Sequence, residues 1–586
     1  MKRLEALSDQ HAYSVKLSRF LVREGAYVAK VTSIDHDVLL DAAARRRKAE
    51  EMLAFITDQL DPAHDDRVSA LKLQPGDAAR AEITRIGLAQ AHRRLSWETS
   101  LAAEKDGEKT DHPAKWTSLA EKYEADDDTA NAAGALSNGL ERLIEVSERA
   151  QRRSVLDGTE GLLEQLGAML DRVPNEMELE IRKVLARAHL TRGEKESATK
   201  EVVAAVDVIE QALSEAGEDR FRRAFLLRDC DDWLGLAAAA DPESTLRFRG
   251  KLRRDCSPIP TDHAQDLVIY PILGRQRGGL LVWHAGELKF TQVTAAHDLA
   301  MVIDALHRHA NRDIGQYKAG NDTEAKWREL LMKLAGMLRL HEVTALMKDA
   351  HVLFVLEGAS VRVPWPALLL AAGAAPASIE LRITSTPPFT RLSGESMVDG
   401  CVTTNAFRGK PTAEQWHQAI SKIAGILGGA CHDWANLPAT PALHDLAVVG
   451  AHGSRRSFEA LTVTVGDKAT RLRAVEFVER IPVGRTTFCA VCFAGGGFLS
   501  GEGHWESMPA LLLARGADRV LANVWPAWDL PTKRGALATL LEEISKAPSN
   551  RDAAKALMAW QEEERIEHPR WWSGWGLWTY LPPEPQ

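Results

Sequence analysis

The chain has 586 residues, too many for a single hydrophobic core, and this length predicts two to four domains. A net charge of −9 with 26% charged residues argues against nucleic acid as the main ligand. Six cysteines are too few for a disulfide framework, and the first ten residues lack the apolar core of a signal peptide, so a cytoplasmic protein is expected. The most apolar stretch, 364–377, is interrupted by prolines and is too short to cross a bilayer of about 30 Å.

Residues 1–255 are rich in Ala, Leu, Glu and Arg at helical spacing, which predicts an all-helical domain. The segments 178–189 and 201–212 have the pattern of amphipathic helices. The basic run 45–48 is followed by two glutamates, which favours a solvated helix face and leaves nucleic acid at most an indirect partner.

Two parts of this domain fit the tetratricopeptide pattern of paired helices and stand 66 residues apart, close to twice its period of about 34 residues. The matching positions are Trp116, Leu119, Ala120, Tyr123, Ala132, Leu136 and Gly139 in the first, and Leu185, Ala186, His189, Gly193, Ala198, Val202 and Ala205 in the second. A generic helical bundle is the alternative. Stacked helical hairpins would offer a concave surface for a regulatory protein partner.

A proline-marked boundary at 256–260 separates this domain from a region with a different pattern. The runs 267–273 and 279–284 predict a hairpin, and further strands are predicted at 352–356, 446–450, 487–492 and 519–524. Helical stretches lie between them. The region therefore predicts an α/β fold, with a central sheet flanked by helices.

Two predicted strands lead into reactive residues, and chemistry in α/β sheets usually lies at the carboxyl ends of strands. One leads into His452 and Gly453, and the other leads into Cys492 and a run of glycines. A neighbouring imidazole can promote formation of the nucleophilic thiolate and then protonate a leaving amine. The backbone N–H groups of Gly453 and Cys492 could hold the oxyanion.

Several motifs occur in a fixed order along this region. They are Val355–Leu368, Ala451-His452-Gly453, Cys492–Gly503, Val520–Asp529 and His568–Trp572. In this order they closely resemble CHAT domains, caspase-like modules often found behind tetratricopeptide repeats, in the clan that includes caspases, separase and gingipains. The resemblance covers residues 262–586, with 262–400 as a pseudo-half and 401–586 as the catalytic half.

The resemblance implies peptide-bond hydrolysis through a dyad of His452 and Cys492. Residues 490–492 read Ala-Val-Cys where the family commonly has Ser-Ala-Cys, and Trp528-Asp529 stands where two acidic residues are frequent. Both departures bear on substrate preference. Asp529 and Trp525 are the candidates for the substrate pocket, where Asp529 would favour Lys or Arg before the scissile bond. The alternative for Asp529 is a helix cap.

Other chemistry is less well supported by the sequence. Cys489 and Cys492 form a Cys-x-x-Cys, but no second pair is suitably spaced for zinc and Cys489 is expected to be buried in its strand. The glycine loop 495–503 lacks the spacing of phosphate-binding loops. Neither a metal nor a cofactor is expected. His444 and Asp445, at the far end of the His452 strand, are expected to be structural, and Glu502 could orient the loop.

The leading hypothesis is a regulated bacterial cysteine endopeptidase that cleaves a protein substrate and is controlled through its helical half. The resemblance adds bacterial antiviral or cell-suicide systems, in which CRISPR-linked regulators or gasdermin-like pore formers are targets. A non-catalytic caspase-fold signalling scaffold, assembled through helical repeats, is the alternative. A nucleotide-binding switch that uses the glycine loop is a third hypothesis.

Overall fold

The computed structural model describes residues between 117 and 580, with gaps, the longer of which are 217–225, 254–265, 310–320, 384–390, 393–399, 404–429, 455–461, 526–533 and 565–574. All described residues belong to one compact unit, Trp116–Gln586. The helices expected before residue 117, with the basic run 45–48, lie outside the described residues, as does the predicted boundary at 256–260. Within the described part, no helix is long and apolar enough to cross a membrane.

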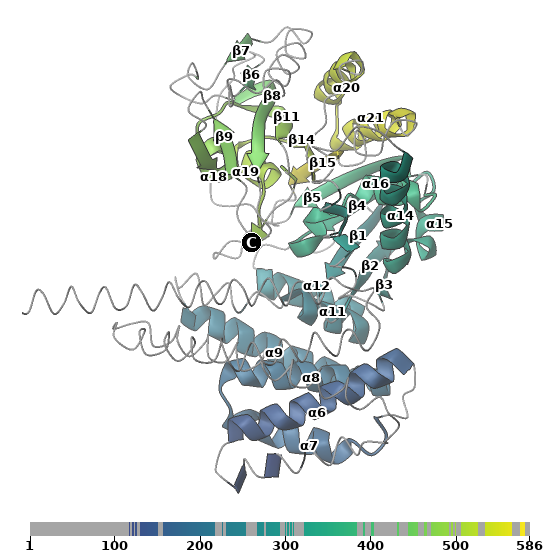
Figure 1. Ribbon diagram of the computed structural model, residues 1–586, viewed down its shortest axis with the longest axis vertical. Helices are drawn as coiled ribbons and strands as arrows, with labels where there is room; N and C mark the ends of the chain where they lie inside the picture. Colours follow the sequence, from purple (N-terminus) through teal and green to yellow (C-terminus); the bar gives the residue numbers. More distant parts are fainter. Residues whose placement is uncertain are drawn as a thin grey trace, which may run out of the picture. The chain divides into compact units, whose positions relative to one another are not determined.

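The first described part of the chain is a layer of helices, which we call the helical layer (Figure 1). It consists of α6 (Thr129–Ala150), α7 (Glu160–Met169), α8 (Asn175–Arg192), α9 (Lys195–Ala216), α11 (Cys230–Ala240) and α12 (Pro242–Arg253), with the short 3₁₀ helix η4 (Leu170–Arg172). Both predicted helical segments are found, within α8 and α9. Gly193 ends α8 in the left-handed conformation, so that α9 packs back on α8. A tetratricopeptide-type repeat stays a prediction.

Most of the described strands build one mixed sheet flanked by helices, which confirms the predicted α/β architecture (Figure 1). Its longer strands are β1 (Leu267–Leu273), β2 (Gly278–His284), β3 (Glu287–Val293), β4 (His351–Leu356), β5 (Ser378–Ile383), β8 (Leu443–Ser454), β11 (Val483–Val491), β14 (Arg519–Asn523) and β15 (Trp575–Tyr580). Its shorter strands are β6 (Gly400–Thr403), β7 (Ala430–His432), β9 (Thr462–Val465) and β10 (Thr470–Arg473). A separate pair is β12 (Phe498–Leu499) with β13 (Trp505–Glu506).

The described strands of the sheet run in the order β10-β9-β8-β11-β14-β15-β5-β4-β1-β2-β3, with β6 on β8 and β7 on β6. The six predicted strands are confirmed as β1, β2, β4, β8, β11 and β14, and β1 and β2 form the predicted antiparallel hairpin. The last strand, β15, lies between β14 and β5. β15 therefore joins β1–β5, on its β5 side, to β8, β11 and β14, on its β14 side.

Further helices accompany the sheet. They are α14 (Asn321–Met337), α15 (Thr344–Met347), α16 (Trp365–Ala371), α18 (Ala474–Val478), α19 (Met508–Arg515), α20 (Arg534–Lys546) and α21 (Asn550–Glu563), with the 3₁₀ helices η6 (Leu340–Glu342) and η7 (Gly358–Arg362). α14 packs on α16, α19 lies on β11 and β14, and α21 packs on β5 and β15. Helices α19 and α21 thus cover β5, β11, β14 and β15.

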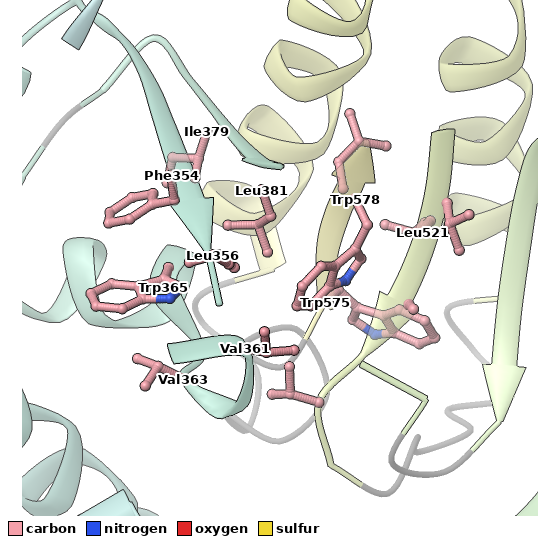
Figure 2. Close-up of a cluster of buried hydrophobic side chains, with 14 of the residues drawn as sticks. Phe354, Leu356, Val361, Val363, Trp365, Ile379, Leu381, Leu521, Trp575 and Trp578 are labelled. Carbon is pink, nitrogen blue, oxygen red and sulfur yellow. The ribbon is translucent and has the colours of Figure 1, made fainter. Parts of the chain in front are cut away.

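The strands β1, β2 and β4 are buried on both faces, and alternate residues belong to different cores. Toward the helical layer point Val268, Tyr270, Ile272, Leu281, Leu353 and Val355, which cluster with residues of α9, α11 and α12. The opposite set, which includes Ile269, Val282, Phe354 and Leu356, packs with Trp327 of α14 and Trp365 of α16. Figure 2 shows Phe354 beside Trp365, and their rings stack at 4.6 Å. Because successive residues of a strand point to opposite faces, these strands pack on the helical layer with one face and on α14 and α16 with the other.

The turn of the β1–β2 hairpin is inserted into the helical layer. A Cβ at Gly235 of α11 would lie 2.7 Å from the carbonyl oxygen of Arg277 in this turn, so only glycine allows the approach. The buried Arg277 guanidinium pairs with Glu148 of α6 at 3.1 Å, and Glu148 also pairs with Arg187 of α8. The helical layer and the sheet are therefore fixed to each other by close backbone contact and by buried charge.

A buried polar cluster crosses β4, β5 and β15. Glu380 is 1% exposed and accepts hydrogen bonds from Arg382 at 2.8 Å and from Thr579 at 2.5 Å, while His351 lies at 3.4 Å. The other ring nitrogen of His351 bonds with Ser378 at 2.5 Å. Burial by itself raises the pKa of Glu380, but the hydrogen bonds and the Arg382 charge outweigh it and hold this pKa at about 2.

We expect Glu380→Gln to destabilise the fold and to remove part of its acid sensitivity. The pKa of the carboxyl is about 2 in the folded chain and near 4.5 in the unfolded chain. Its contribution to the free energy of unfolding is therefore complete above pH 4.5 and is lost as the pH falls toward 2. At pH 7 the variant should lose about 3–5 kcal/mol, because the mostly buried Arg382 loses its charged partner. Urea unfolding from pH 2 to pH 7 measures both effects.

Glu287→Gln is the matched control, because Glu287 pairs with Lys289 on the solvent side of β3. It should leave the urea midpoint unchanged. An equally stable Glu380→Gln variant with the pH dependence of the wild type would contradict the assignment of the polar cluster.

Candidate functional site

The two predicted reactive segments belong to neighbouring parallel strands of the sheet: His452 and Gly453 lie near the end of β8, and Cys492 directly follows β11. β8 and β11 pair in parallel along their length, and the last pair in register is Ala451 with Val491. The next residues along the chain are His452 after Ala451 and Cys492 after Val491. The register thus brings the two residues that precede the predicted dyad side by side, at the carboxyl end of β11 and three residues before that of β8.

The structure gives different detail for the individual candidates. β8 continues through His452 and Gly453, whose backbones pair with Thr464 and Val463 of the antiparallel strand β9, and Gly453 is buried. For His452 the backbone alone is described. Cys492, Asp529 and Glu502 lie outside the described residues.

The turn beyond β11 is anchored to the end of β14 and to the start of α19. Ala494 N–H donates to the Val491 carbonyl at 3.1 Å, and Gly495 N–H donates to the Asn523 carbonyl at 2.9 Å. The Ala494 carbonyl in turn accepts from Met508 N–H at 3.2 Å. These bonds fix the chain three residues after Cys492 to the neighbouring strand.

Gly495 also needs its lack of a side chain. A Cβ there would lie 2.9 Å from Val524 Cγ1 and 3.1 Å from Trp578 Cζ2. The turn therefore packs directly on β14 and β15. At this position the glycine is required by close packing.

Trp525, a candidate for the substrate pocket, is fully buried at 0% exposure. Its ring meets Trp327 edge to face at 4.6 Å and His307 at 6.3 Å, and the backbone N–H of Trp525 donates to Asn523 Oδ1 at 3.2 Å. The described surroundings of the ring are core side chains. Its part in a pocket stays a prediction.

Asn523 is a residue that the sequence analysis missed. It ends β14, is 0% exposed, and holds the turn at Gly495 through its carbonyl and the chain at Trp525 through its side chain. A buried asparagine at the end of an apolar strand was the available signal, because such a side chain must find hydrogen-bond partners.

Cys489 lies in β11, three residues before Cys492, and is fully buried as predicted. Burial raises the pKa of its thiol to about 12, because the thiolate is poorly solvated there. It is therefore neutral at physiological pH and is not a nucleophile. Among the described residues, His, Cys, Asp and Glu do not gather into a group of three that could hold a metal ion.

His444 and Asp445 lie at the start of β8, at the end opposite His452, as predicted. Asp445 is exposed and stands 4.0 Å from Arg485 on β11. An exposed pair at this distance contributes little stability. Both positions are thus remote from the strand ends where the candidate site lies, and they can serve as controls.

We expect Cys489 to resist alkylation in the folded protein. At pH 8 a thiol with a pKa of about 12 is about 10⁻⁴ ionised, and the sulfur is also shielded from the reagent. Iodoacetamide treatment followed by peptide mass spectrometry should find Cys489 unmodified in buffer and fully modified in urea. Modification at equal rates in both solutions would contradict its burial.

We expect Gly495→Ala to destabilise the protein by about 1–3 kcal/mol, because the new methyl group overlaps Val524 and Trp578. Gly167→Ala in α7 is the matched control, since a Cβ there meets nothing within 4 Å, and it should be neutral or stabilising by up to about 1 kcal/mol. Urea unfolding compares the two variants. Equal stability of both would show that the turn yields to the extra methyl group.

Comparisons with known proteins give a distant likeness. No family model matches the chain, and no curated protein matches its sequence. Two crystal structures of the Saccharomyces cerevisiae separase–securin complex, at 2.6 Å and 3.0 Å resolution, match 97% of this chain at 10% identity, with TM-scores of 0.44 and 0.45. The chain spans 50% of the length of these matched chains. At this identity and TM-score the likeness concerns the course of the backbone alone.

Proposed function

We propose that this chain is a cysteine endopeptidase of the caspase-like CHAT type, which cleaves a protein substrate through His452 and Cys492. The observation that carries the proposal is the register of β8 and β11, which pairs Ala451 with Val491. Each is followed directly by one member of the dyad. In a parallel sheet, side chains that follow two such paired residues are candidates for one shared site.

The proposed reaction follows from the chemistry of the two groups. The Cys492 sulfur, as thiolate, attacks the carbonyl carbon of the scissile peptide bond, and His452 protonates the leaving amine. Water then hydrolyses the thioester, releases the acid product and restores the thiol. The N–H groups of Gly453 and Cys492 are the proposed donors to the oxyanion.

Substrate selection is assigned to the chain beyond β14. Asp529 is the proposed acidic group for Lys or Arg before the scissile bond, through a charge-assisted hydrogen bond. The buried Trp525 would then act from the core side of this pocket, because its ring packs on Trp327 and His307. No cofactor or metal takes part in this scheme.

The resemblance to CHAT proteins supports a wider role for the proposed peptidase. Such modules act in bacterial antiviral or cell-suicide systems, and a CRISPR-linked regulator or a gasdermin-like pore former is a proposed substrate. A regulatory protein bound by the helical layer is the proposed trigger, in a cytoplasmic setting. The helical layer suits regulation of the peptidase by a bound partner, because this layer is fixed to the sheet through Arg277 and the β1–β2 turn.

We expect Cys492→Ala and His452→Gln to abolish cleavage. Fluorogenic peptides with Lys or Arg before the scissile bond should be hydrolysed by the wild type and at least about 10³-fold more slowly by either variant, because each change removes a reacting group. A labelled peptide probe with a thiol-reactive group should modify Cys492 before the other cysteines.

Cys489→Ala and His444→Gln are the controls, from the same two strands, and should keep the activity of the wild type. Undiminished cleavage by Cys492→Ala would exclude the proposed nucleophile. Labelling of Cys492 no faster than of the other cysteines, with no cleavage, would favour the non-catalytic scaffold.

A further inference from the structure

We infer that Arg249 of α12 is a positioning residue, through which the helical layer holds the chain at the end of β14 and the turn beyond β11. The inference concerns how these elements are held together, and its meaning for catalysis rests on the proposed function. It is carried by a continuous series of contacts between described residues, which begins at a buried ion pair.

The first contact joins the helical layer to the end of β4. Arg249 pairs with Glu357 at 2.7 Å, and their side chains are only 8% and 11% exposed. The Arg249 guanidinium also lies 4.8 Å from the ring centre of Tyr270 on β1. A buried ion pair is costly to break from one side, because the remaining charge is left without compensation. Arg249 therefore fixes the position of Glu357.

The second contact passes from Glu357 to η7. Glu357 caps this 3₁₀ helix: its side chain accepts from the Ser360 N–H, and its own N–H donates to Ser360 Oγ at 3.0 Å. The Ser360 carbonyl accepts from Trp365 Nε1 at 3.0 Å. Figure 2 shows Trp365 and Val361 at this end of β4. A displacement of Glu357 would therefore loosen η7.

The third contact passes from η7 to Trp525. The Arg362 carbonyl, at the end of η7, accepts from His307 Nε2 at 2.8 Å. The His307 ring meets Trp525 edge to face at 6.3 Å, and Trp327 closes on the same indole at 4.6 Å. All three rings are buried to at least nine-tenths. The position of Trp525 thus depends on η7, His307 and Trp327.

The last contact passes from Trp525 to the turn beyond β11. Trp525 N–H donates to the Asn523 side chain, and the Asn523 carbonyl accepts from Gly495 N–H at 2.9 Å. Gly495 follows Cys492 by three residues. Close packing makes such a series of contacts stiff, because interior side chains have little free volume to absorb a shift.

Hydrogen exchange of the full-length protein tests this coupling, with Arg249→Gln as the main variant. The peptide that contains Gly495 should exchange at least about fivefold faster than in the wild type, because its N–H bond to Asn523 opens more often. Peptides from α7 should not change. Glu357→Gln, which removes the charge and keeps an acceptor for Ser360, should give the same effect more weakly and serves if Arg249→Gln does not fold.

Lys251→Gln is the matched control, because Lys251 lies on the same helix and makes an exposed pair with Asp207 at 3.1 Å. It should leave exchange at Gly495 unchanged. Combining Arg249→Gln with Trp525→Phe should raise exchange by less than the product of the separate effects, since both changes act on one series of contacts. Unchanged exchange at Gly495 in a folded Arg249→Gln variant would overturn the inference.

A second readout separates this inference from the proposed peptidase. If Cys492 is the nucleophile, Arg249→Gln should slow its alkylation at neutral pH by about fivefold and shift the pH profile of labelling. Faster exchange at Gly495, together with a Cys492 that is unreactive even in the wild type, would keep the positioning role and reject the nucleophile. Unchanged exchange at Gly495, together with a reactive Cys492, would reject the positioning role and keep the nucleophile.

Discussion

The structure depends on the need to bury both faces of one mixed sheet. Parallel strands such as β1 and β4 have apolar side chains on both sides, so each face must be covered by helices. For β1 and β4, one cover comes from α14 and α16 and the other from the helical layer. The helical layer is therefore part of the core of the sheet region, and any partner bound to it would act on a body that already contacts the strands.

The polar groups inside this core show where the fold is most constrained. Glu380 brings three strands together, Arg277 inserts the β1–β2 turn among the helices, and Arg249 attaches α12 to the end of β4. Each of these buried charges has a partner of opposite charge, which is the condition under which buried charge is tolerated. These sites lie at junctions between elements. They therefore restrict how the elements can be arranged, in addition to contributing stability.

Much of this architecture could be predicted from the sequence, because apolar runs bounded by turns indicate strands. Leu267–Leu273 and Arg519–Asn523 are clear examples. β5 was missed because Glu380 and Arg382 interrupt its apolar pattern, and the reason for these charges is a cluster whose members come from β4 and β15. β15 was missed because its pairing between β14 and β5 depends on strands far away in the chain. Local patterns carry no information on such long-range pairing.

The candidate site illustrates the same division between local pattern and tertiary context. The sequence places two cysteines three residues apart, and their letters alone do not say which could be a nucleophile. Burial inside β11 raises the pKa of the Cys489 thiol to about 12 and takes it out of consideration. The proposed nucleophile is therefore the cysteine that lies beyond the end of the strand. Cys492 is the cysteine that follows β11, and the paired strand β8 contains His452.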